Sequence, residues 1–319
     1  MHVYRDIQNL PFIENAVITI GTFDGVHLGH QKIIDQLKKE AQRIGGQTVI
    51  VTFYPHPRKI VHKEQAPLML LTTLSEKLHL LESYGIDHVV VVPFNEGFAE
   101  QTAASYVEDF LVSKLHPRVV IIGYDHKFGK DRKGDYTTLE HYGKLHGFSV
   151  IEIPEKVLNE VTVSSTAIRA AVKAGEVKTA LSLMGHPYAL SGHVEKGNQL
   201  GRTIGYPTAN IHEPEPDKLL PAFGIYAVQV RMESGDVLDG MLSIGIRPTI
   251  GESPMTIEVN IFDFNQDIYG QHLSVLFIER LRDELKFDGL EPLKAALGRD
   301  ELNTKEALSR YKKQRGSGL

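Results

Sequence analysis

Two histidines, His27 and His30, stand three residues apart in the stretch T-I-G-T-F-D-G-V-H-L-G-H near the N-terminus. At the start of a helix this spacing puts both imidazoles on one side, where they can donate hydrogen bonds to a phosphate chain and stabilise charge that develops on it. Gly29 between them lets a ligand come close to the backbone. The alternative interpretation is a pair of surface histidines, in a chain that has fifteen histidines.

The residues around these histidines predict a strand, a tight turn and a helix. The run 16–20 is short, apolar and β-branched, as is typical of a buried strand, and Gly21 ends it. Residues 28–44 carry apolar side chains at helical spacing. Because the first turn of a helix has unpaired N–H groups and partial positive charge, this arrangement favours an anion such as phosphate.

His56 and Asp125 each follow a predicted strand. His56 lies in Y-P-H-P-R after the strand 48–53, between two prolines that fix the backbone, and Asp125 lies in G-Y-D-H-K-F-G after the strand 118–123. Open α/β sheets bind ligands at the carboxyl ends of their strands, so both side chains are candidates for a ligand site. The alternatives are an ordinary loop for His56 and a turn-forming carboxylate for Asp125.

A second helix start is predicted in V-T-V-S-S-T-A-I-R, which ends at Arg169. Ser164 or Ser165 can cap that helix, and hydroxyl groups beside the N–H groups of a helix start form another anion site. Arg169 is permanently charged and can bind phosphate oxygens with a forked pair of hydrogen bonds. We therefore expect Arg169 to stabilise transition-state charge.

Predicted strands and helices alternate through the first half of the chain. Continuous apolar strands at 87–93 and 118–123 flank a helical pattern at 103–114, and a helix and a strand within 138–153 complete the series. This alternation predicts an α/β doubly wound parallel sheet of the Rossmann-like kind, with its crevice at the strand carboxyl ends.

The second half changes to short strands with turns between them. The strands are expected at 188–194, 224–230, 236–246, 256–262 and 272–278. Their spacing predicts a small antiparallel β-barrel, and helical stretches at 290–297 and 304–313 predict a C-terminal helix that closes one end. We place the domain boundary near residue 185, which gives domains 1–184 and 185–319.

The segment 192–211, G-H-V-E-K-G-N-Q-L-G-R-T-I-G-Y-P-T-A-N-I, holds four glycines. Its backbone N–H groups could wrap a phosphate chain, although the Walker A pattern is absent and a Gly-rich hairpin alone is weak support. In the later run T-I-E-V-N-I-F, Glu258 falls on the polar face of an alternating strand. An ordinary exposed carboxylate is the alternative to a chemical role for Glu258.

Together these motifs resemble one family. G-T-F-D-G-V-H-L-G-H is similar to the H-x-G-H signature of nucleotidyltransferases, and G-Y-D-H-K-F-G and S-S-T-A-I-R resemble further elements of that group. G-R-T-I-G-Y-P-T-A-N, S-I-G-I-R-P-T and T-I-E-V-N-I-F-D-F resemble the flavokinase domain. The chain thus resembles the bacterial bifunctional riboflavin kinase/FMN adenylyltransferases, or FAD synthetases, over about residues 16 to 290.

The resemblance implies two ATP-dependent reactions with different chemical needs. The second domain is expected to phosphorylate riboflavin to FMN, with Glu258 as the base that accepts the proton of the ribityl hydroxyl. The first is expected to join FMN and ATP to give FAD and pyrophosphate. Because the FMN phosphate is already anionic, that step mainly needs alignment and charge neutralisation by His27, His30, Arg169 and Mg²⁺.

The same resemblance implies the binding residues. Thr208 and Asn210 supply hard oxygen ligands for the cofactor Mg²⁺, held with the ATP phosphates, and Phe128 and Arg282 are expected near the flavin. The expected ATP-binding residues of the first domain are Gly21, Phe23, Asp24, Gly29, His56, Asp125, Ser164, Ser165 and Thr166. Those of the second domain are Gly192, Gly197, Gly201, Arg202, Gly205 and Pro207.

Departures from the family pattern occur at His126, Lys127 and Asn260, where they bear on flavin affinity rather than on the class of reaction. A rival interpretation is an adenylyl- or cytidylyltransferase for another small phosphate, which leaves P-T-A-N and Glu258 without a purpose. A rival of another class is a flavin-binding or regulatory module that has lost turnover.

Composition narrows the classes of function. The chain of 319 residues is long enough for two domains, and its net charge of −5 with mixed signs argues against binding to nucleic acid or to a membrane surface. With no cysteine, disulfides and thiolate chemistry are excluded. The start M-H-V-Y-R-D-I-Q lacks the pattern of a signal peptide, so we expect a cytoplasmic protein whose partners are riboflavin, FMN and ATP. A monomer and a homo-oligomer both remain open.

Overall fold

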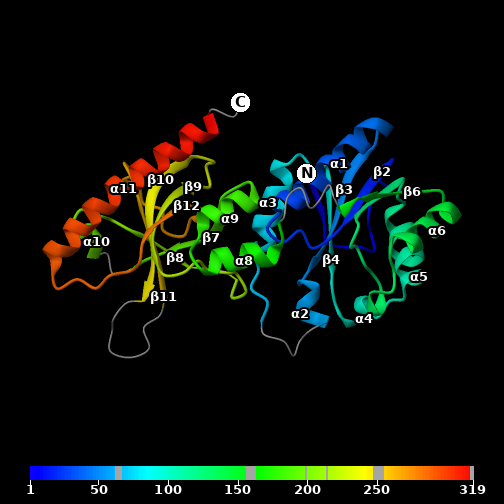
Figure 1. Ribbon diagram of the computed structural model, residues 1–319, viewed down its shortest axis with the longest axis horizontal. Coiled ribbons are helices and arrows are strands. Elements are labelled where there is room, and N and C mark those ends of the chain that lie inside the picture. Colours follow the sequence, from blue (N-terminus) through cyan, green and yellow to red (C-terminus); the bar gives the residue numbers. More distant parts are fainter. Residues whose placement is uncertain (62–66, 156–162, 198–199, 213–214, 247–254, 317–319) are drawn as a thin grey trace. The chain divides into compact units, whose positions relative to one another are not determined.

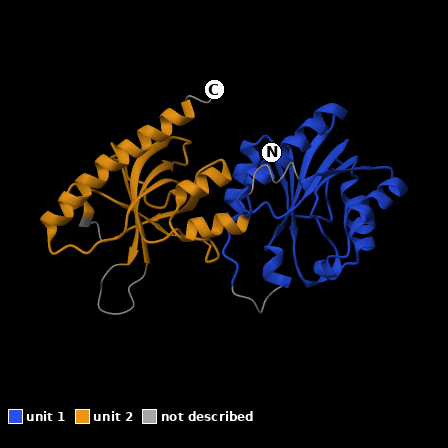
Figure 2. Ribbon diagram, viewed as in Figure 1, with its two compact units in different colours: residues 1–164 blue, residues 165–319 orange. Residues whose placement is uncertain are grey.

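The computed structural model describes residues 1–61, 67–155, 163–197, 200–212, 215–246 and 255–316 (Figure 1). The chain forms two compact units, unit 1 over Met1–Ser164 and unit 2 over Ser165–Leu319 (Figure 2). Three parts of the motifs, Val161–Thr162, Asn198–Gln199 and Arg247–Thr249, lie outside the described residues.

Unit 1 is built on a parallel sheet. Its described strands are β1 (His2–Tyr4), β2 (Ala16–Ile20), β3 (Gln47–Tyr54), β4 (His88–Pro93), β5 (Val119–Gly123) and β6 (Ser149–Ile153). They lie side by side in the order β1-β4-β3-β2-β5-β6, and every pair is parallel. The predicted doubly wound sheet is thus confirmed, with the short edge strand β1 as an addition that the sequence did not predict.

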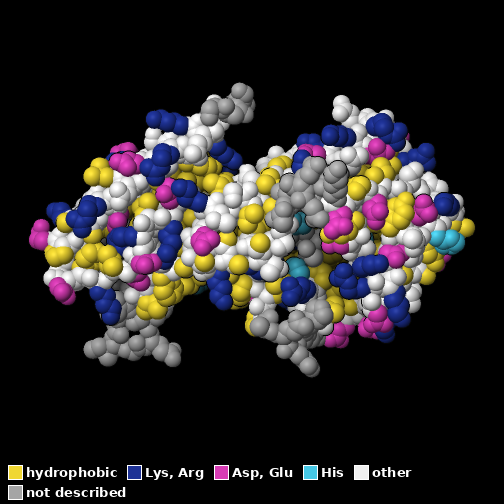
Figure 3. All heavy atoms as spheres, viewed as in Figure 1, with side chains coloured by type: hydrophobic (Ala, Val, Ile, Leu, Met, Phe, Trp, Pro, Cys, Tyr) yellow, Lys and Arg dark blue, Asp and Glu magenta, His cyan; other side chains and the backbone are white. Residues whose placement is uncertain are grey.

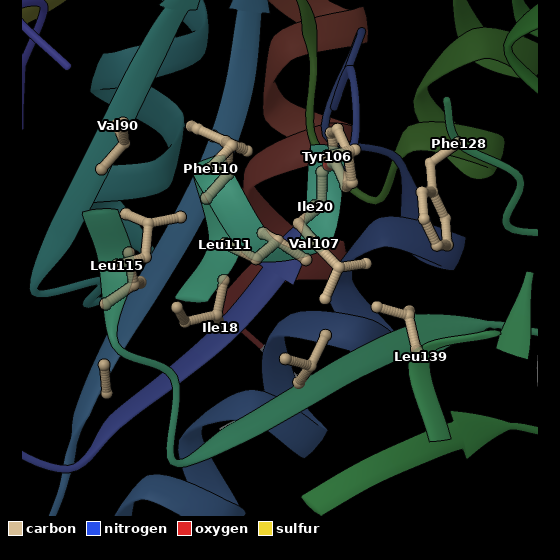
Figure 4. Close-up of a cluster of buried hydrophobic side chains, with 14 of the residues drawn as sticks. Ile18, Ile20, Val90, Tyr106, Val107, Phe110, Leu111, Leu115, Phe128 and Leu139 are labelled. Atoms are coloured by element: carbon tan, nitrogen blue, oxygen red, sulfur yellow. The ribbon is translucent and has the colours of Figure 1, made fainter. Parts of the chain in front are cut away.

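Helices cover both faces of this sheet, because successive strand residues point to opposite sides. Val17 packs in one cluster with residues of α1 (Leu28–Ile44) and α3 (Leu74–Ser83). Ile18 and Ile20 pack in the other cluster with Tyr106, Phe110 and Leu111 of η1 (Tyr106–Leu115) and with α6 (Tyr136–His146) (Figure 4). Short helices occur at α2 (Pro57–Val61), α4 (Glu96–Ala99), α5 (Ala103–Ser105) and η2 (Lys130–Arg132).

Unit 2 begins with two helices, α8 (Ser165–Lys173) and α9 (Val177–Met184), and α9 packs against barrel strands β7 and β12. These helices therefore belong to the compact unit that holds the barrel. The compact units divide between residues 164 and 165. The boundary near residue 185 was predicted between the two catalytic domains, and it stays a prediction.

The rest of unit 2 is a closed antiparallel barrel with the strand order β10-β11-β8-β7-β12-β9. The strands are β7 (Tyr188–Glu195), β8 (Ala209–His212), β9 (Gly224–Arg231), β10 (Val237–Ile246), β11 (Met255–Ile261) and β12 (His272–Arg282). Tyr188, Tyr226 and Phe277 are buried in its interior. A short helix, α10 (Leu200–Thr203), lies between β7 and β8.

A single C-terminal helix, α11 (Leu290–Gly316), packs along β9, β10 and β12. The sequence predicted two helical stretches with a break between them, whereas the helix is continuous. Residues 298–303, which separate the two predicted stretches, are helical as well, and Oγ1 of Thr304 donates a hydrogen bond to the carbonyl oxygen of Asp300 at 2.7 Å. Ala307 and Leu308 then bury the helix against Ala227 and Ile278 of the barrel.

Candidate active sites

The histidine motif lies at the point in the sheet of unit 1 where the order of strand addition reverses. β2 and β5 are neighbours although α1, α3 and two strands separate them in sequence, so the carboxyl ends of these two strands form the crevice in which such sheets bind ligands. His27 caps the start of α1 with extended backbone angles, φ −68° and ψ 172°. The motif therefore places both histidines at the start of the helix that follows β2.

The two imidazoles stack on one another. The ring centroids of His27 and His30 are 3.8 Å apart with an angle of 18° between the ring planes. Burial, the neighbouring His27 and the positive charge of Lys77 hold the pKa of His30 well below its usual value. Its Nδ1 atom is buried and makes no hydrogen bond with any described residue. A neutral imidazole of this kind keeps one N–H for donation to a bound anion.

The turn before the helix has an unusual backbone. Phe23, Gly25 and Val26 have positive φ angles of 49°, 81° and 37°. Phe23 is fully buried, and its ring centroid lies 4.9 Å from that of His30. A Cβ atom on Gly29 would lie 3.2 Å from the His27 ring, so glycine there leaves room for the stacked pair. Gly21 and Phe23 thus shape the turn that carries the histidines.

Asp24 has partners inside the protein. Its carboxylate accepts hydrogen bonds from the backbone N–H groups of Leu71 and Thr72, each at 3.0 Å to Oδ1. The backbone N–H of Gly25 donates in turn to Oγ1 of Thr72 at 3.1 Å. Asp24 therefore ties the turn to the segment before α3, and its predicted contact with ATP stays a prediction.

Lys77 of α3 was missed by sequence reasoning. It is 6% exposed, and its ammonium group donates to Oγ1 of Thr52 at 3.2 Å. A lysine inside an amphipathic helical pattern gives no sign of burial, since the pattern alone does not say what faces it. Thr52 in turn donates to the carbonyl oxygen of Thr22 at 3.1 Å, so Lys77 is linked to the turn that carries the histidines.

The other predicted residues of unit 1 lie at strand ends. His56 precedes α2 and its Nδ1 accepts a hydrogen bond from the N–H of Arg58 at 3.2 Å. Asp125 is exposed just after β5. Phe128 is buried in the core cluster, with its ring centroid 4.9 Å from that of Tyr106 (Figure 4). Its predicted flavin contact is untested.

Unit 1 should lose stability in acid because it buries neutral histidines. Burial lowers the pKa of His126 to about 4, below the 6.5 of an ordinary histidine, and the pKa of His30 is lowered too. Between these values the unfolded chain binds more protons than the folded one, so stability falls as the pH falls below about 6.5. We expect the unfolding temperature of unit 1 to drop by several degrees from pH 7.5 to pH 5.

Calorimetry at the two pH values measures this effect. His126→Gln should reduce the drop, whereas His141→Gln, which alters an exposed histidine of α6, should leave it as in the natural chain. An equal drop in both variants would contradict the assignment to His126.

The predicted triphosphate-binding residues of the second motif lie on or next to α8. Ser165 and Thr166 begin the helix, Arg169 lies one turn further, and Ser164 directly precedes it. Apart from Ser164, these residues belong to unit 2, whereas the histidines belong to unit 1. Neither unit by itself brings Arg169 together with His27 and His30.

Three predicted residues of the kinase motif come together in the barrel. Glu258 of β11 lies directly opposite Asn210 of β8, so their side chains share a face. Oγ1 of Thr208 donates to Oε2 of Glu258 at 2.9 Å. The predicted base and the two predicted Mg²⁺ ligands are therefore one cluster, assembled from segments that are far apart in sequence.

Asn260 is a functional candidate whose burial the sequence did not predict. It lies two residues after Glu258 on the same face of β11, yet it is 7% exposed. Its Nδ2 donates to the carbonyl oxygen of Pro207 at 2.6 Å. Asn260 thus fastens the segment that carries Thr208 to the strand that carries Glu258.

Glycines let the Gly-rich segment fold closely. A Cβ atom on Gly201 would lie 2.1 Å from the carbonyl oxygen of Tyr206, and one on Gly197 would lie 2.2 Å from Nδ2 of Asn210. A larger residue at 201 would therefore require the backbone to shift, and one at 197 would require the Asn210 side chain to move. The segment therefore turns sharply around α10 and returns beside Thr208, Asn210 and Glu258. Arg202 of α10 is exposed.

Arg282, the predicted flavin contact, is held by an acidic partner that sequence reasoning missed. Its Nε donates to Oδ1 of Asp300 at 2.9 Å and its Nη2 to Oδ2 at 2.6 Å. Asp300 lies on α11 and is 3% exposed. The forked pair fixes the guanidinium, and no feature of the sequence pairs residues 18 apart across a strand and a helix.

The Mg²⁺ prediction fits the oxygen donors of the barrel cluster. The hydroxyl of Thr208 and the amide oxygen of Asn210 are hard ligands of the type that Mg²⁺ takes together with ATP phosphates. Both residues lie beside Glu258, the predicted base. Within the described residues there is no group of three or more His, Cys, Asp or Glu side chains suited to a metal ion.

Comparisons with known proteins cover both halves of the chain. A family model for FAD synthetase matches residues 10–167, and one for riboflavin kinase matches residues 184–308. The bifunctional riboflavin kinase/FMN adenylyltransferase of Haemophilus influenzae is 38% identical over 301 residues, which is 94% of this chain and 97% of that protein. The enzyme of the same name from Escherichia coli (strain K12) is 38% identical over 308 residues, covering 96% and 97%.

One solved structure is similar over nearly the full length. It is described as a macrolide-efflux protein from Streptococcus pneumoniae, with a TM-score of 0.82, 32% identity, and coverage of 95% of this chain and 98% of that chain. In the part of the present chain that the structure describes, no helix is both long and apolar enough to cross a membrane.

The first family model ends at residue 167 and the second begins at residue 184, so Arg169 lies between them. The relatives extend over both halves in a single chain. The chain therefore belongs to the bifunctional riboflavin kinase/FMN adenylyltransferase family, and it makes FMN from riboflavin and ATP and then FAD and pyrophosphate from FMN and ATP.

Proposed function

We propose that His27 and His30 bind the ATP phosphates in the N-terminal half during adenylyl transfer. A phosphate oxygen of FMN attacks the α-phosphorus of ATP, the bond to the β-phosphate breaks, and pyrophosphate leaves. The observation that carries the proposal is the stacked pair of imidazoles at the start of α1, of which His27 is buried and His30 is half-buried. Arg169 is proposed to neutralise charge on the triphosphate in the same step.

Glu258 is proposed as the base of the kinase reaction. It accepts the proton of the terminal ribityl hydroxyl as that oxygen attacks the γ-phosphorus of ATP, and ADP leaves. The supporting observation is the hydrogen bond from Thr208 to its carboxylate, which holds the proposed base beside a proposed Mg²⁺ ligand. Thr208 and Asn210 would hold Mg²⁺, which would neutralise charge on the phosphates.

A single incubation tests these reactions against the rival functions. The chain with riboflavin, ATP and Mg²⁺ should yield FMN first and FAD later, as separated by chromatography with fluorescence detection. Product from a different phosphate acceptor would favour the rival nucleotidyltransferase, and binding of flavin without any product would favour a regulatory module. A cytoplasmic location and the oligomeric state remain predictions.

Asn260→Ala should slow the kinase reaction and leave the rate of adenylyl transfer unchanged. The variant loses the hydrogen bond to Pro207 and so loosens the segment that carries Thr208 relative to Glu258. Because misplacement of a metal ligand weakens alignment, kcat for FMN formation should fall about tenfold. Steady-state assays of FMN formation and of FAD formation from supplied FMN measure the two effects. A kcat for FMN formation that equals that of the natural chain would contradict this role.

A further inference from the structure

The buried lysine of unit 1 is part of a hydrogen-bonded chain that ends in the histidine turn. The ammonium group of Lys77 donates to Oγ1 of Thr52 at 3.2 Å, and that hydroxyl donates to the carbonyl oxygen of Thr22 at 3.1 Å. Thr52 lies on β3 and is fully buried, and Thr22 directly precedes Phe23 in the turn. Three elements thus meet through one hydroxyl group.

The start of α3 holds Lys77 firmly in this position. Thr73 and Glu76 form a capping box, in which Oγ1 of Thr73 accepts from the N–H of Glu76 at 3.2 Å. The backbone N–H of Lys77 donates to the carbonyl oxygen of Thr73 at 3.0 Å. Just before this helix, Leu71 and Thr72 bind the carboxylate of Asp24 in the turn. The turn and α3 are therefore connected at two points, one through Asp24 and one through Lys77.

We propose that Lys77 is a positioning residue for adenylyl transfer, which acts through Thr52 on the backbone of the histidine turn and supplies a fixed positive charge to the phosphate-binding region. The inference rests on the proposed role of His27 and His30 and extends it to a residue outside every motif.

The free-energy cost of burying the Lys77 ammonium group supports a functional role for this residue. A buried ammonium group loses its hydration, which most lysines of amphipathic helices avoid by facing the solvent. An anionic ligand at the turn would interact favourably with this charge, since opposite charges attract strongly away from water. With the imidazole of His30 kept neutral by its lowered pKa, Lys77 would add positive charge to the region that binds the triphosphate.

Three variants of the full chain separate position from charge. Lys77→Met removes both the hydrogen bond and the charge, and Thr52→Val removes the link to Thr22 while the charge stays. Lys38→Met is the matched control, because Lys38 is an exposed lysine of α1 that donates to the carbonyl oxygen of Tyr84, near the other end of α3, at 2.9 Å. Each variant is assayed for FAD formation from FMN and for FMN formation from riboflavin.

We expect Lys77→Met to lower kcat/KM for ATP in FAD formation by at least about tenfold, Thr52→Val by about threefold, and Lys38→Met by less than about twofold. FMN formation should be normal in all three. A second measurement is the titration midpoint of His30, followed by NMR in protein with isotope-labelled histidines. The charged groups that lower the pKa of His30 are His27 and Lys77. Lys77→Met removes one of these positive charges, so the titration midpoint of His30 should rise.

The inference is overturned if Lys77→Met forms FAD as fast as Lys38→Met, or if the His30 midpoint does not move. If Lys77→Met fails to fold in unit 1, Thr52→Val decides, and an unchanged kcat/KM in that variant also overturns it. Failure of the natural chain to form FAD at all would instead contradict the proposed role of the histidines, so the two failures are distinguishable.

Discussion

His30→Ala is expected to abolish FAD formation while the conversion of riboflavin to FMN continues. The imidazole of His30 is half-buried, stacked on His27 and kept neutral by its lowered pKa, and these features suit it to donate a hydrogen bond to a phosphate oxygen that gains charge in the transition state. Loss of one such donor costs a factor of about 100 to 1,000 in rate. The kinase cluster lies in the other compact unit and should not respond.

Rates of the two steps, measured separately with riboflavin or FMN as the starting flavin, test this expectation. His141→Ala, a change at an exposed histidine of α6, is the matched control and should keep both rates. FAD formation by His30→Ala at the rate of the natural chain would contradict the role of His30. Loss of both reactions in a folded variant would contradict independent sites.

Glu258→Ala is expected to give the converse result. Without the carboxylate no group accepts the ribityl proton, and the hydrogen-bond acceptor of Thr208 is lost as well. General-base catalysis of this kind contributes a factor of about 100 to 10,000, so FMN formation should nearly stop. FAD should still form when FMN is supplied, because adenylyl transfer does not need a base to activate an anionic phosphate.

Glu258→Gln sharpens the measurement, since it keeps the size of the side chain but cannot accept the proton. Both variants should show the same loss of kcat. Glu306→Gln on the exposed side of α11 is the control for removal of a carboxylate and should leave both reactions unchanged. FMN formation at more than about a tenth of the natural rate in Glu258→Gln would contradict a role as base.

The fold was predictable where local patterns and tertiary structure agree. The run 89–92 is apolar at every position, as a strand buried on both faces must be, and it forms the interior of β4. The spacing of apolar residues likewise predicted the strand, turn and helix around His27. The C-terminal helix was predicted with a break at 298–303, because nothing local shows that Asp300 in this stretch is buried and paired with Arg282.

The site was predictable only where residue types repeat a known pattern. Thr208, Asn210 and Glu258 were predicted, and they lie together. Lys77, Asn260 and the partner of Arg282 were not predicted, because their roles depend on the element packed against them. A lysine in a helix or an asparagine in an alternating strand is normally solvated, and only the tertiary neighbours turn it into a buried donor.

Mixing the two inactive variants tests the central claim of two independent sites most directly. His30→Ala and Glu258→Ala are incubated together with riboflavin, ATP and Mg²⁺, and each is also incubated alone. The account predicts that FMN released by His30→Ala is taken up by Glu258→Ala, so that FAD forms in the mixture and in neither single incubation. A mixture that accumulates FMN but never forms FAD would contradict the account.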